Sequence, residues 1–360
     1  MKRHVIRFMF VLPFLALVML VCSSSAYAQF DFSACEGVEP QSQISKDCLN
    51  IMSAFSEPLV IPVPLDVTTL SNYSFWRVIG SNPNIFDAPG GSVVRQLPNG
   101  FNFVRVIDSS VDGWVQIETG EWMMAADVEY REASYYRGVR ILNGLQTEFA
   151  WVLGDMFSHQ YPGSPQDTEN GRLLLRYDRV NIFAKTVDED GWAWYMIGPD
   201  QWVEQRMVAK VFPIERPEGV TGRWVVIDLY EQTLVAYEND TPVFATLVSS
   251  GYPPNETNEG LFEVWARLDV DGMSGFTGAP EAYALQSVPW VMYFDGSAAL
   301  HGTYWHDVFG YRSSRGCVNL SISDASFLFH WFDDSLPNED GVVVNYVYVY
   351  SSGEYRPLGT

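Results

Sequence analysis

Short apolar runs separated by turn residues make up most of the chain. Between residues 76 and 128, runs such as 101–107 and 114–117 alternate apolar with polar positions, and Gly, Pro, Asn and Asp residues stand between them. Such alternation predicts strands with one buried face, and its spacing predicts a small antiparallel barrel. The pattern therefore predicts a mainly β protein.

One arrangement of turn and strand occurs twice. An Asp-Gly-Trp sequence at residues 112–114 leads into two strands that each contain a tryptophan. A second Asp-Gly-Trp sequence at residues 190–192 begins a similar arrangement, and its tryptophan, Trp192, lies 78 positions after Trp114. The repeat predicts two β modules, at residues 72–131 and 137–216, which resemble bacterial SH3-type wall-binding domains. Core packing is the ordinary role of such tryptophans, and carbohydrate or peptide binding on their faces is the alternative.

After a linker at residues 213–221, a second group of apolar runs begins. Runs at 223–229, 233–237 and 242–251 predict a β meander. Further strands are predicted at residues 260–268, 290–294, 298–302 and 341–350. A helix is predicted after Ser323 and Asp324, which can cap it, because Phe327, Leu328 and Trp331 share one face.

The N-terminus has the pattern of an export signal. Three basic residues precede an apolar run at residues 8–21, and a small-x-small sequence ends at Ala28. We predict that residues 1–28 are a signal peptide cleaved after Ala28 and that the protein is exported. Lipid attachment at Cys22 and an uncleaved anchor are the alternatives. Residues 29–71 then form a polar N-terminal segment that ends in a Pro-rich linker.

Charge and motifs exclude several classes of ligand. The formal net charge is −22, and it becomes −25 without residues 1–28, which hold three basic and no acidic residues. Such an acidic surface disfavours nucleic acid and anionic membranes as partners. The sequence contains no Cys-x-x-Cys, no His-Glu-x-x-His and no Gly-rich phosphate loop, so no metal or cofactor is expected.

Three cysteines remain after removal of the predicted signal peptide. In an oxidising compartment Cys35 and Cys48 can close a small disulfide loop, which leaves Cys317 unpaired. His301 stands sixteen residues before Cys317. A thiolate is the reactive form of cysteine, and imidazole titrates near neutrality, so the pair has the parts of a nucleophile and its base. An inert buried cysteine is the alternative, and His306 is the competing base.

The residues around this pair match a known motif. His-Gly-Thr at 301–303 is followed by Ser-Arg-Gly-Cys-Val-Asn at 314–319, and Thr-Asn-Glu-Gly occupies 257–260. The opening strands contain Ile-Asp at 227–228, Glu-Gln-Thr-Leu at 231–234 and Val-Ser-Ser-Gly at 248–251. With these features, residues 222–350 resemble the catalytic domain of the L,D-transpeptidases, the YkuD-type family of peptidoglycan cross-linking enzymes. The resemblance implies a β-sandwich-like fold with one or two short helices and makes Cys317 and His301 the catalytic pair.

Two positions depart from the family pattern. Asn258 replaces a proline, a change that affects little beyond turn rigidity. Arg315 replaces the histidine two positions before the cysteine, and arginine cannot accept a proton. A fixed positive charge beside Cys317 is instead expected to favour the thiolate.

The neighbouring residues receive supporting roles. The resemblance implies that the Gly302 carbonyl orients the imidazole, and Gly316 permits a sharp turn in which the Gly316 and Cys317 amides form an oxyanion hole. Arg315 is a candidate for binding a substrate carboxylate. The predicted substrate-contacting residues are Ser314, Arg315, Asn319, Tyr304, Trp305 and His306.

The implied reaction is acyl transfer between peptidoglycan stem peptides. Cys317 would attack the third residue of a tetrapeptide stem, release the terminal D-alanine and pass the acyl group to an amine of a second stem, giving a 3→3 cross-link in cell wall biogenesis. By the same resemblance, carbapenem β-lactams are expected to acylate Cys317. With water as the acceptor the site would be an L,D-carboxypeptidase or endopeptidase, and a non-catalytic peptidoglycan-binding protein is the third possibility. A papain-like hydrolase is disfavoured because its cysteine precedes its histidine.

Overall fold

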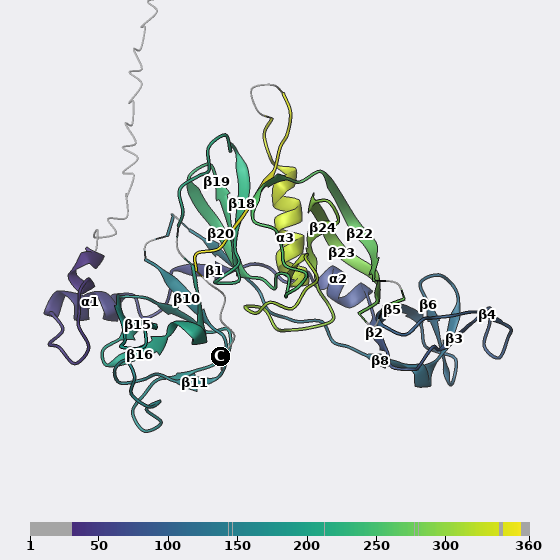
Figure 1. Ribbon diagram of the computed structural model, residues 1–360, viewed down its shortest axis with the longest axis horizontal. Coiled ribbons are helices and arrows are strands. Elements are labelled where there is room, and N and C mark those ends of the chain that lie inside the picture. The colour runs from purple at the N-terminus through teal and green to yellow at the C-terminus, as the bar shows by residue number, and fades with distance from the viewer. Residues whose placement is uncertain are drawn as a thin grey trace, which may run out of the picture.

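The computed structural model describes residues 31–353 except residues 143, 146, 212, 277, 280 and 338–340. The predicted signal peptide, residues 1–28, lies outside the described residues, so its cleavage after Ala28 stays a prediction. Figure 1 shows two sheets and a long helix at the centre of the molecule, with one β unit at each end. Among the described residues, no helix has the length and apolar character needed to span a membrane.

The fold is mainly β, which confirms the prediction from the alternating pattern. The helical elements are η1 (Phe32–Cys35), α1 (Lys46–Ala54), α2 (Val67–Asn72), η2 (Ala125–Asp127), η3 (Gln205–Met207) and α3 (Ile322–Asp333). The strands before residue 131 are β1 (Val60–Pro62), β2 (Phe75–Val78), β3 (Asn84–Phe86), β4 (Val93–Gln96), β5 (Phe101–Asp108), β6 (Trp114–Ile117), β7 (Trp122–Met124) and β8 (Val128–Tyr130). Those up to residue 211 are β9 (Val139–Ile141), β10 (Phe149–Val152), β11 (Met156–Phe157), β12 (Leu173–Leu174), β13 (Arg179–Asn181), β14 (Ala184–Val187), β15 (Ala193–Gly198), β16 (Gln201–Glu204) and β17 (Val208–Val211). The remaining strands are β18 (Arg223–Asp228), β19 (Thr233–Glu238), β20 (Thr241–Leu247), β21 (Gly260–Glu263), β22 (Ala266–Gly275), β23 (Tyr283–Asp295), β24 (Ala298–Gly302), β25 (Val318–Leu320) and β26 (Tyr346–Tyr350).

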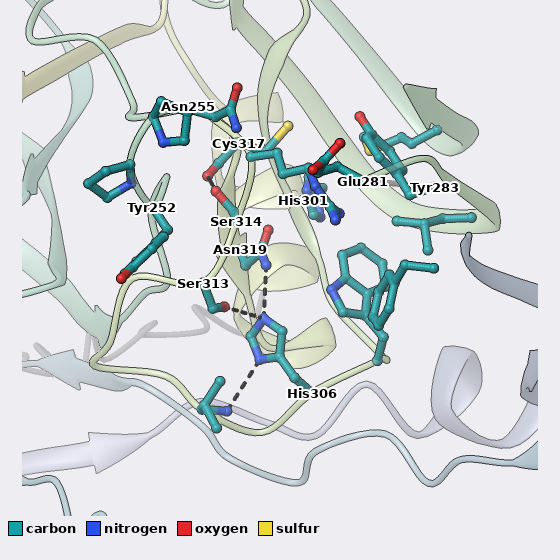
Figure 2. Close-up of a pocket in the computed structure, with 18 residues that line it drawn as sticks. Tyr252, Asn255, Glu281, Tyr283, His301, His306, Ser313, Ser314, Cys317 and Asn319 are labelled. Carbon is teal, nitrogen blue, oxygen red and sulfur yellow. Dashed lines mark hydrogen bonds between the residues drawn. The ribbon is translucent and has the colours of Figure 1, made fainter. Parts of the chain in front are cut away.

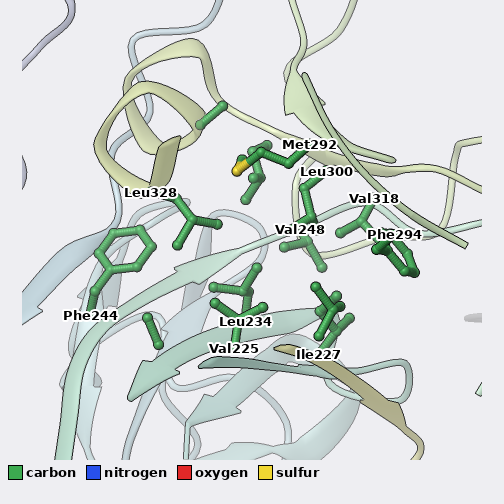
Figure 3. Packing of buried hydrophobic residues seen from close by; sticks show 14 of the residues in the cluster. Val225, Ile227, Leu234, Phe244, Val248, Met292, Phe294, Leu300, Val318 and Leu328 are labelled. Carbon is green, nitrogen blue, oxygen red and sulfur yellow. The ribbon is translucent and has the colours of Figure 1, made fainter. Parts of the chain in front are cut away.

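Two sheets enclose the main core of the second half of the chain. One sheet has the strand order β1-β9-β20-β19-β18-β26-β21, and the other contains β23, β24 and β25. Ile227 of the first sheet and Met292 and Leu300 of the second belong to one buried cluster, to which α3 adds Leu328 (Figure 3). Each such side chain stabilises the fold by about 1.5–3 kcal/mol. The predicted meander is confirmed as β18, β19 and β20.

Strand β18 is buried on both faces. Val225 and Ile227 belong to the core between the two sheets, whereas Trp224 and Val226 belong to a second core that includes Trp151 of β10. Alternate side chains of a strand point to opposite faces, so a layer on each side buries every position. This arrangement explains why the run from Trp224 to Ile227 is continuously apolar rather than alternating.

The two predicted repeats share an order of elements. In the first, β6 and β7 are followed by η2 and β8, and in the second β15 and β16 are followed by η3 and β17. Strand β9, at the start of the second predicted module, pairs with β20 of the central sheet, and β1, from the predicted N-terminal segment, pairs with β9. The first unit is also joined to the centre, since β5 pairs with β23. The SH3-like assignment of residues 72–131 and 137–216 remains a prediction.

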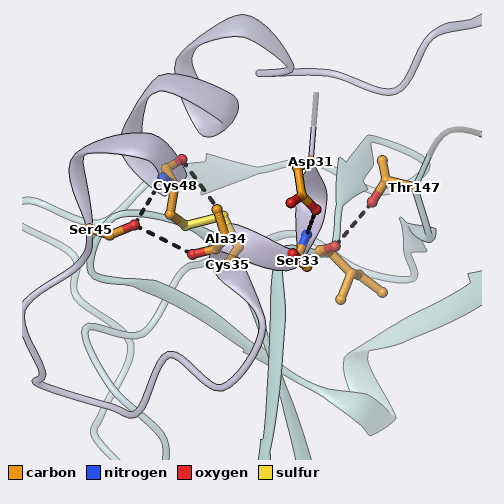
Figure 4. Close-up of a disulfide and its surroundings, with 8 residues drawn as sticks. Asp31, Ser33, Ala34, Cys35, Ser45, Cys48 and Thr147 are labelled. Carbon is orange, nitrogen blue, oxygen red and sulfur yellow. Dashed lines mark hydrogen bonds between the residues drawn. A yellow bond between two sulfur atoms is a disulfide. The ribbon is translucent and has the colours of Figure 1, made fainter. Parts of the chain in front are cut away.

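The N-terminal segment is held by a disulfide. Cys35 and Cys48, the pair proposed from the sequence, are bonded to each other and fully buried (Figure 4). Ser45 caps α1 by accepting a hydrogen bond from the Cys48 amide at 3.1 Å. The disulfide shares a cluster with Trp194 and Trp202 of the second unit, so these two tryptophans serve the core.

Helix α3 starts two residues earlier than the sequence analysis predicts. Its N-cap is Ser321, whose hydroxyl accepts a hydrogen bond from the Asp324 amide at 3.1 Å. Asp324 is fully buried in the first turn, and its carboxylate accepts hydrogen bonds from Gly138 N at 2.7 Å and Thr246 Oγ1 at 2.7 Å. The carboxylate thus ties the helix to the central sheet and to the segment before β9.

Asp324→Asn should weaken the pH dependence of stability. Burial raises the pKa of Asp324 from 3.8 to about 6 in the folded protein. A carboxyl that holds its proton to higher pH in the folded state than in the unfolded state stabilises the fold most in acid. Above pH 6, ionisation of Asp324 lowers the free energy of unfolding by roughly 3 kcal/mol relative to the protonated form. Urea unfolding should show that the free energy of unfolding of wild type falls between pH 5 and pH 8 by about 1–2 kcal/mol more than that of the variant. Parallel stability curves for the two proteins would contradict this assignment.

Candidate active site

Strands β24 and β25 bring the predicted catalytic residues together. The two strands are parallel neighbours with His301 in register with Asn319, and Cys317 immediately precedes β25. On the other side of β25, the amides and carbonyls of Ser249 and Asn319 form reciprocal hydrogen bonds of 3.0 and 2.9 Å. Residues two apart on a strand share a face, so Cys317 and Asn319 point to the side that His301 occupies. All three line a cleft of 540 Å³ (Figure 2).

Cys317 is the free thiol among the cysteines that the structure describes. It is partly buried, and its sulfur lies 3.9 Å from the carbonyl oxygen of Ser297. Burial raises the pKa of the thiol, and a hydrogen bond from the Ala299 backbone opposes this shift in part. The resting form at neutral pH is therefore the protonated thiol. The expected lowering by Arg315 is not among the causes of the shift.

His301 is buried with one ring nitrogen already engaged. Its Nδ1 lies 3.2 Å from the carbonyl oxygen of Gly302, the contact that the resemblance implies. Because a carbonyl only accepts, Nδ1 carries the hydrogen and Nε2 is left as the acceptor. Burial lowers the pKa of His301 to about 4, although the Gly302 hydrogen bond favours the charged form. A neutral imidazole that lines the same cleft as a neutral thiol can work as a general base, whereas a resting ion pair is disfavoured.

His306 uses both ring nitrogens, in contacts with its own loop and with Asn319 of β25. Its Nδ1 accepts a hydrogen bond from Val308 N at 3.2 Å, and its Nε2 lies 2.8 Å from Asn319 Nδ2 and 3.2 Å from Ser313 Oγ (Figure 2). Burial and the neighbouring His301 lower its pKa to about 4. His306 lines the cleft and holds Asn319 in place, and this makes it a weaker candidate for the base than His301.

The loop before Cys317 differs in one respect from the predicted oxyanion hole. Gly316 N donates a hydrogen bond to Ser314 Oγ at 3.2 Å, and the Ser314 hydroxyl donates to the carbonyl oxygen of Cys317. The Gly316 amide is thus used inside the loop, and so is the Ser314 hydroxyl that was expected to contact substrate. Gly316 has φ +110°, which a residue with a side chain rarely adopts. Thr257, noted in the sequence only as part of a motif, donates to Gly316 O at 2.9 Å.

Arg315 lies over an aromatic ring at the rim of the cleft. Its guanidinium carbon is 5.3 Å from the centre of the Tyr283 ring. Arg315, Tyr283 and Cys317 line both the first cleft and a second one of 380 Å³, which also includes Glu256 and Asp295. Among the described residues that line these two clefts, Arg315 is the one lysine or arginine, which suits it to bind an anionic group.

The prediction for Tyr304 as a groove residue is wrong. Its side chain is 1% exposed, its ring stacks on Phe75 with 3.7 Å between centroids, and its hydroxyl donates to Gln286 O at 2.6 Å. Trp305, the next residue, does line the cleft and packs against His301. The sequence analysis missed Phe101, Tyr252 and Glu281, which reach the cleft from distant segments without a local motif. No group of three or more potential metal ligands occurs within the described residues.

Comparison with known proteins agrees with this geometry. Residues 222–344 match the model of the YkuD L,D-transpeptidase catalytic domain, which confirms the predicted resemblance for 123 of the 360 residues. No curated protein matches the chain.

Several solved structures are similar to part of the chain. An L,D-transpeptidase from Stackebrandtia nassauensis is 24% identical, with 40% of this chain and 60% of that one covered and a TM-score of 0.28. The catalytic domain of the E. faecium L,D-transpeptidase is 21% identical over 37% of this chain and 99% of that one, with a TM-score of 0.29. The L,D-transpeptidase LdtMt1 in complex with imipenem is 18% identical, with 44% of this chain and 76% of that one covered and a TM-score of 0.31. At these TM-scores the structures add nothing to what the family model shows.

Proposed function

We propose that residues 222–350 form a peptidoglycan L,D-transpeptidase that makes 3→3 cross-links through a cysteine acyl-enzyme. The observation that carries the proposal is the pairing of β24 with β25, which places His301 and Cys317 on one cleft. The free thiol, the buried imidazole with an open Nε2 and the family match of residues 222–344 support the same conclusion.

The first half-reaction transfers the acyl group to the enzyme. The Cys317 sulfur attacks the carbonyl carbon of the third residue of a tetrapeptide stem, while His301 Nε2 accepts the thiol proton. The tetrahedral intermediate collapses as the C–N bond to the terminal D-alanine breaks, and His301 gives its proton to the departing nitrogen. The products are a thioester on Cys317 and free D-alanine.

The second half-reaction returns the enzyme to its starting form. A side-chain amine of a second stem attacks the thioester, and His301 removes its proton and then restores the thiol. The new amide is the 3→3 cross-link. Water in place of the amine gives an L,D-carboxypeptidase or endopeptidase with the same nucleophile. Arg315 is proposed to bind a carboxylate of the stem peptide, because it supplies positive charge to an otherwise acidic pair of clefts.

Incubation with a disaccharide tetrapeptide tests the reaction class. We expect a cross-linked dimer lighter than two substrates by one D-alanine, detected by mass spectrometry. Loss of D-alanine without dimer would instead establish the carboxypeptidase. Unchanged substrate, together with failure of imipenem to modify Cys317, would favour a non-catalytic peptidoglycan-binding protein.

The cellular setting is part of the same proposal. We propose that the protein is exported with removal of residues 1–28 and acts in the cell wall, where stem peptides are its partners and carbapenems its inhibitors. The buried disulfide is consistent with an oxidising compartment. Wall binding by the units at 72–131 and 137–216 is proposed on their sequence resemblance alone.

A further inference from the structure

The first β unit is continuous with the sheet that carries the catalytic pair. Among the described strands, one sheet runs from β25 through β24 and β23 to β5 and the rest of this unit. Strand β5 pairs in parallel with β23, with Phe101 opposite Tyr283 and Phe103 opposite Leu285. A unit attached only as a tether to the wall would not require strand pairing of this kind with the catalytic domain.

Close packing secures this junction. Phe101 N donates to Ala282 O at 2.8 Å, and Arg105 N donates to the side-chain oxygen of Gln286 at 3.0 Å. At Gly100, a Cβ atom would lie 2.5 Å from Ala282 O, so only glycine permits this approach of the two backbones. The junction therefore fixes the end of the hairpin formed by β22 and β23.

Aromatic contacts link the unit to the neighbourhood of His301. Phe75 and Phe103 pack on Tyr304, with ring centroids 3.7 and 5.7 Å apart. Trp305 follows Tyr304 and packs against His301 at 5.5 Å between ring centroids. The unit therefore supports the segment that leads from β24 into the cleft.

Phe101 itself lines the cleft. The same cleft is lined by Tyr283, Leu285 and Met273 of the β22–β23 hairpin. In Figure 2, Tyr283 lies on the side of Cys317 and His301 opposite to Tyr252. Phe101 and Tyr283 are register partners, so their side chains share a face of the sheet. Together these residues form an apolar wall beside a nucleophile whose substrate carries polar amides.

We propose that this wall, with Phe101 as its upstream member, is the subsite for the side-chain methylenes of the diamino acid at the third position of the acyl donor. The inference rests on the proposed function, in which Cys317 attacks the carbonyl of that third residue. Because the attacked carbon lies at the sulfur, the side chain of the same residue must lie on a wall adjacent to Cys317. Apolar methylenes gain free energy from contact with Phe101, Leu285 and Met273, while the terminal amine extends beyond them to solvent.

The test measures binding rather than turnover. In a Cys317→Ala background, Phe101→Ala should weaken binding of the disaccharide tetrapeptide about tenfold in isothermal titration calorimetry, and Phe101→Leu should restore part of the affinity. A tetrapeptide with alanine in the third position should bind both proteins equally, because it lacks the methylenes. Phe86→Ala is the matched control, since Phe86 belongs to the same unit but packs on Trp114 away from the cleft.

Each outcome has a defined meaning. Undetectable binding, an unchanged Kd in Phe101→Ala, or an equal loss in Phe86→Ala would overturn the subsite. The alanine-containing peptide separates a lost contact from a distorted fold, because distortion weakens binding of both peptides and a lost contact weakens only one. Failure of wild-type Cys317 to become acylated would refute the proposed function while leaving this binding result readable.

Discussion

Cys317→Ala is expected to abolish covalent modification by imipenem. The wild-type protein should gain the mass of one inhibitor molecule on Cys317, and the variant should gain none, a loss of at least about a thousandfold in rate. The reason is that the thioester requires this sulfur, and the other two cysteines after residue 28 are joined to each other. Intact-protein mass spectrometry followed by peptide mapping makes the measurement.

A thiol count provides the control for this variant. Protein without residues 1–28 should show one reactive thiol per unfolded chain, and Cys317→Ala should show none. Alanine is a small change at a partly buried position, so the melting temperature should remain close to that of wild type. An imipenem adduct on folded Cys317→Ala protein would refute the role of this sulfur.

Local patterns predicted much of the central fold, and the long hairpin shows where they failed. The apolar runs of the meander became β18, β19 and β20, because turn residues separate these runs in the sequence. The single strand predicted at residues 260–268 is two strands, β21 and the start of β22. The rest of β22 was not predicted, since most of its later residues are polar or glycine. Strand β23 was predicted only at 290–294, because Pro289 is unfavourable inside a strand. The backbone is irregular at the same place, where Ser287 and Trp290 have positive φ, and the sequence does not reveal this irregularity.

In the candidate site, residues close together in the sequence could be predicted, and residues that reach the cleft from distant segments could not. His301, Cys317 and the Gly302 carbonyl lie on two adjacent strands, and a motif of less than twenty residues could identify them. Phe101 comes from some two hundred positions away, through the pairing of β5 with β23, which no local pattern encodes. Tyr304 was misplaced because its position beside Trp305 in sequence does not reveal that its ring is stacked beneath Phe75.

Burial sets the protonation states at this site more strongly than neighbouring charge does. The sequence analysis expected Arg315 to favour a thiolate, but the guanidinium lies over Tyr283, and burial raises the pKa of the partly buried thiol. Burial shifts the pKa values of the two proposed catalytic groups in opposite directions, because it disfavours the charged form of each. Both shifts favour a neutral resting pair, so in the proposed mechanism proton transfer accompanies attack.

His301→Ala should lower the rate of acylation by roughly 100- to 10,000-fold and change its dependence on pH. In wild type, His301 has a pKa of about 4 and is therefore available as a base at every pH above that value. The acylation rate should fall only as the pH drops toward 4 and should be nearly constant around neutrality. In the variant the thiolate must form without a base, so the rate should rise about tenfold for each pH unit through neutrality. Stopped-flow kinetics with imipenem from pH 4.5 to pH 9 would measure both profiles.

His306→Ala is the matched control for this profile. His306 lines the same cleft and has a similarly lowered pKa, but both of its ring nitrogens are engaged, one by Val308 N and the other by the Asn319 side chain. We expect a smaller loss, with the flat profile of wild type retained, because Asn319 loses a partner while the base remains. If His306→Ala instead acquired the steep profile and His301→Ala kept the flat one, the roles of the two histidines would be exchanged. A wild-type rate that decreased from pH 8 to pH 6 would indicate that the group acting as base becomes protonated near neutrality, contrary to the lowered pKa of His301.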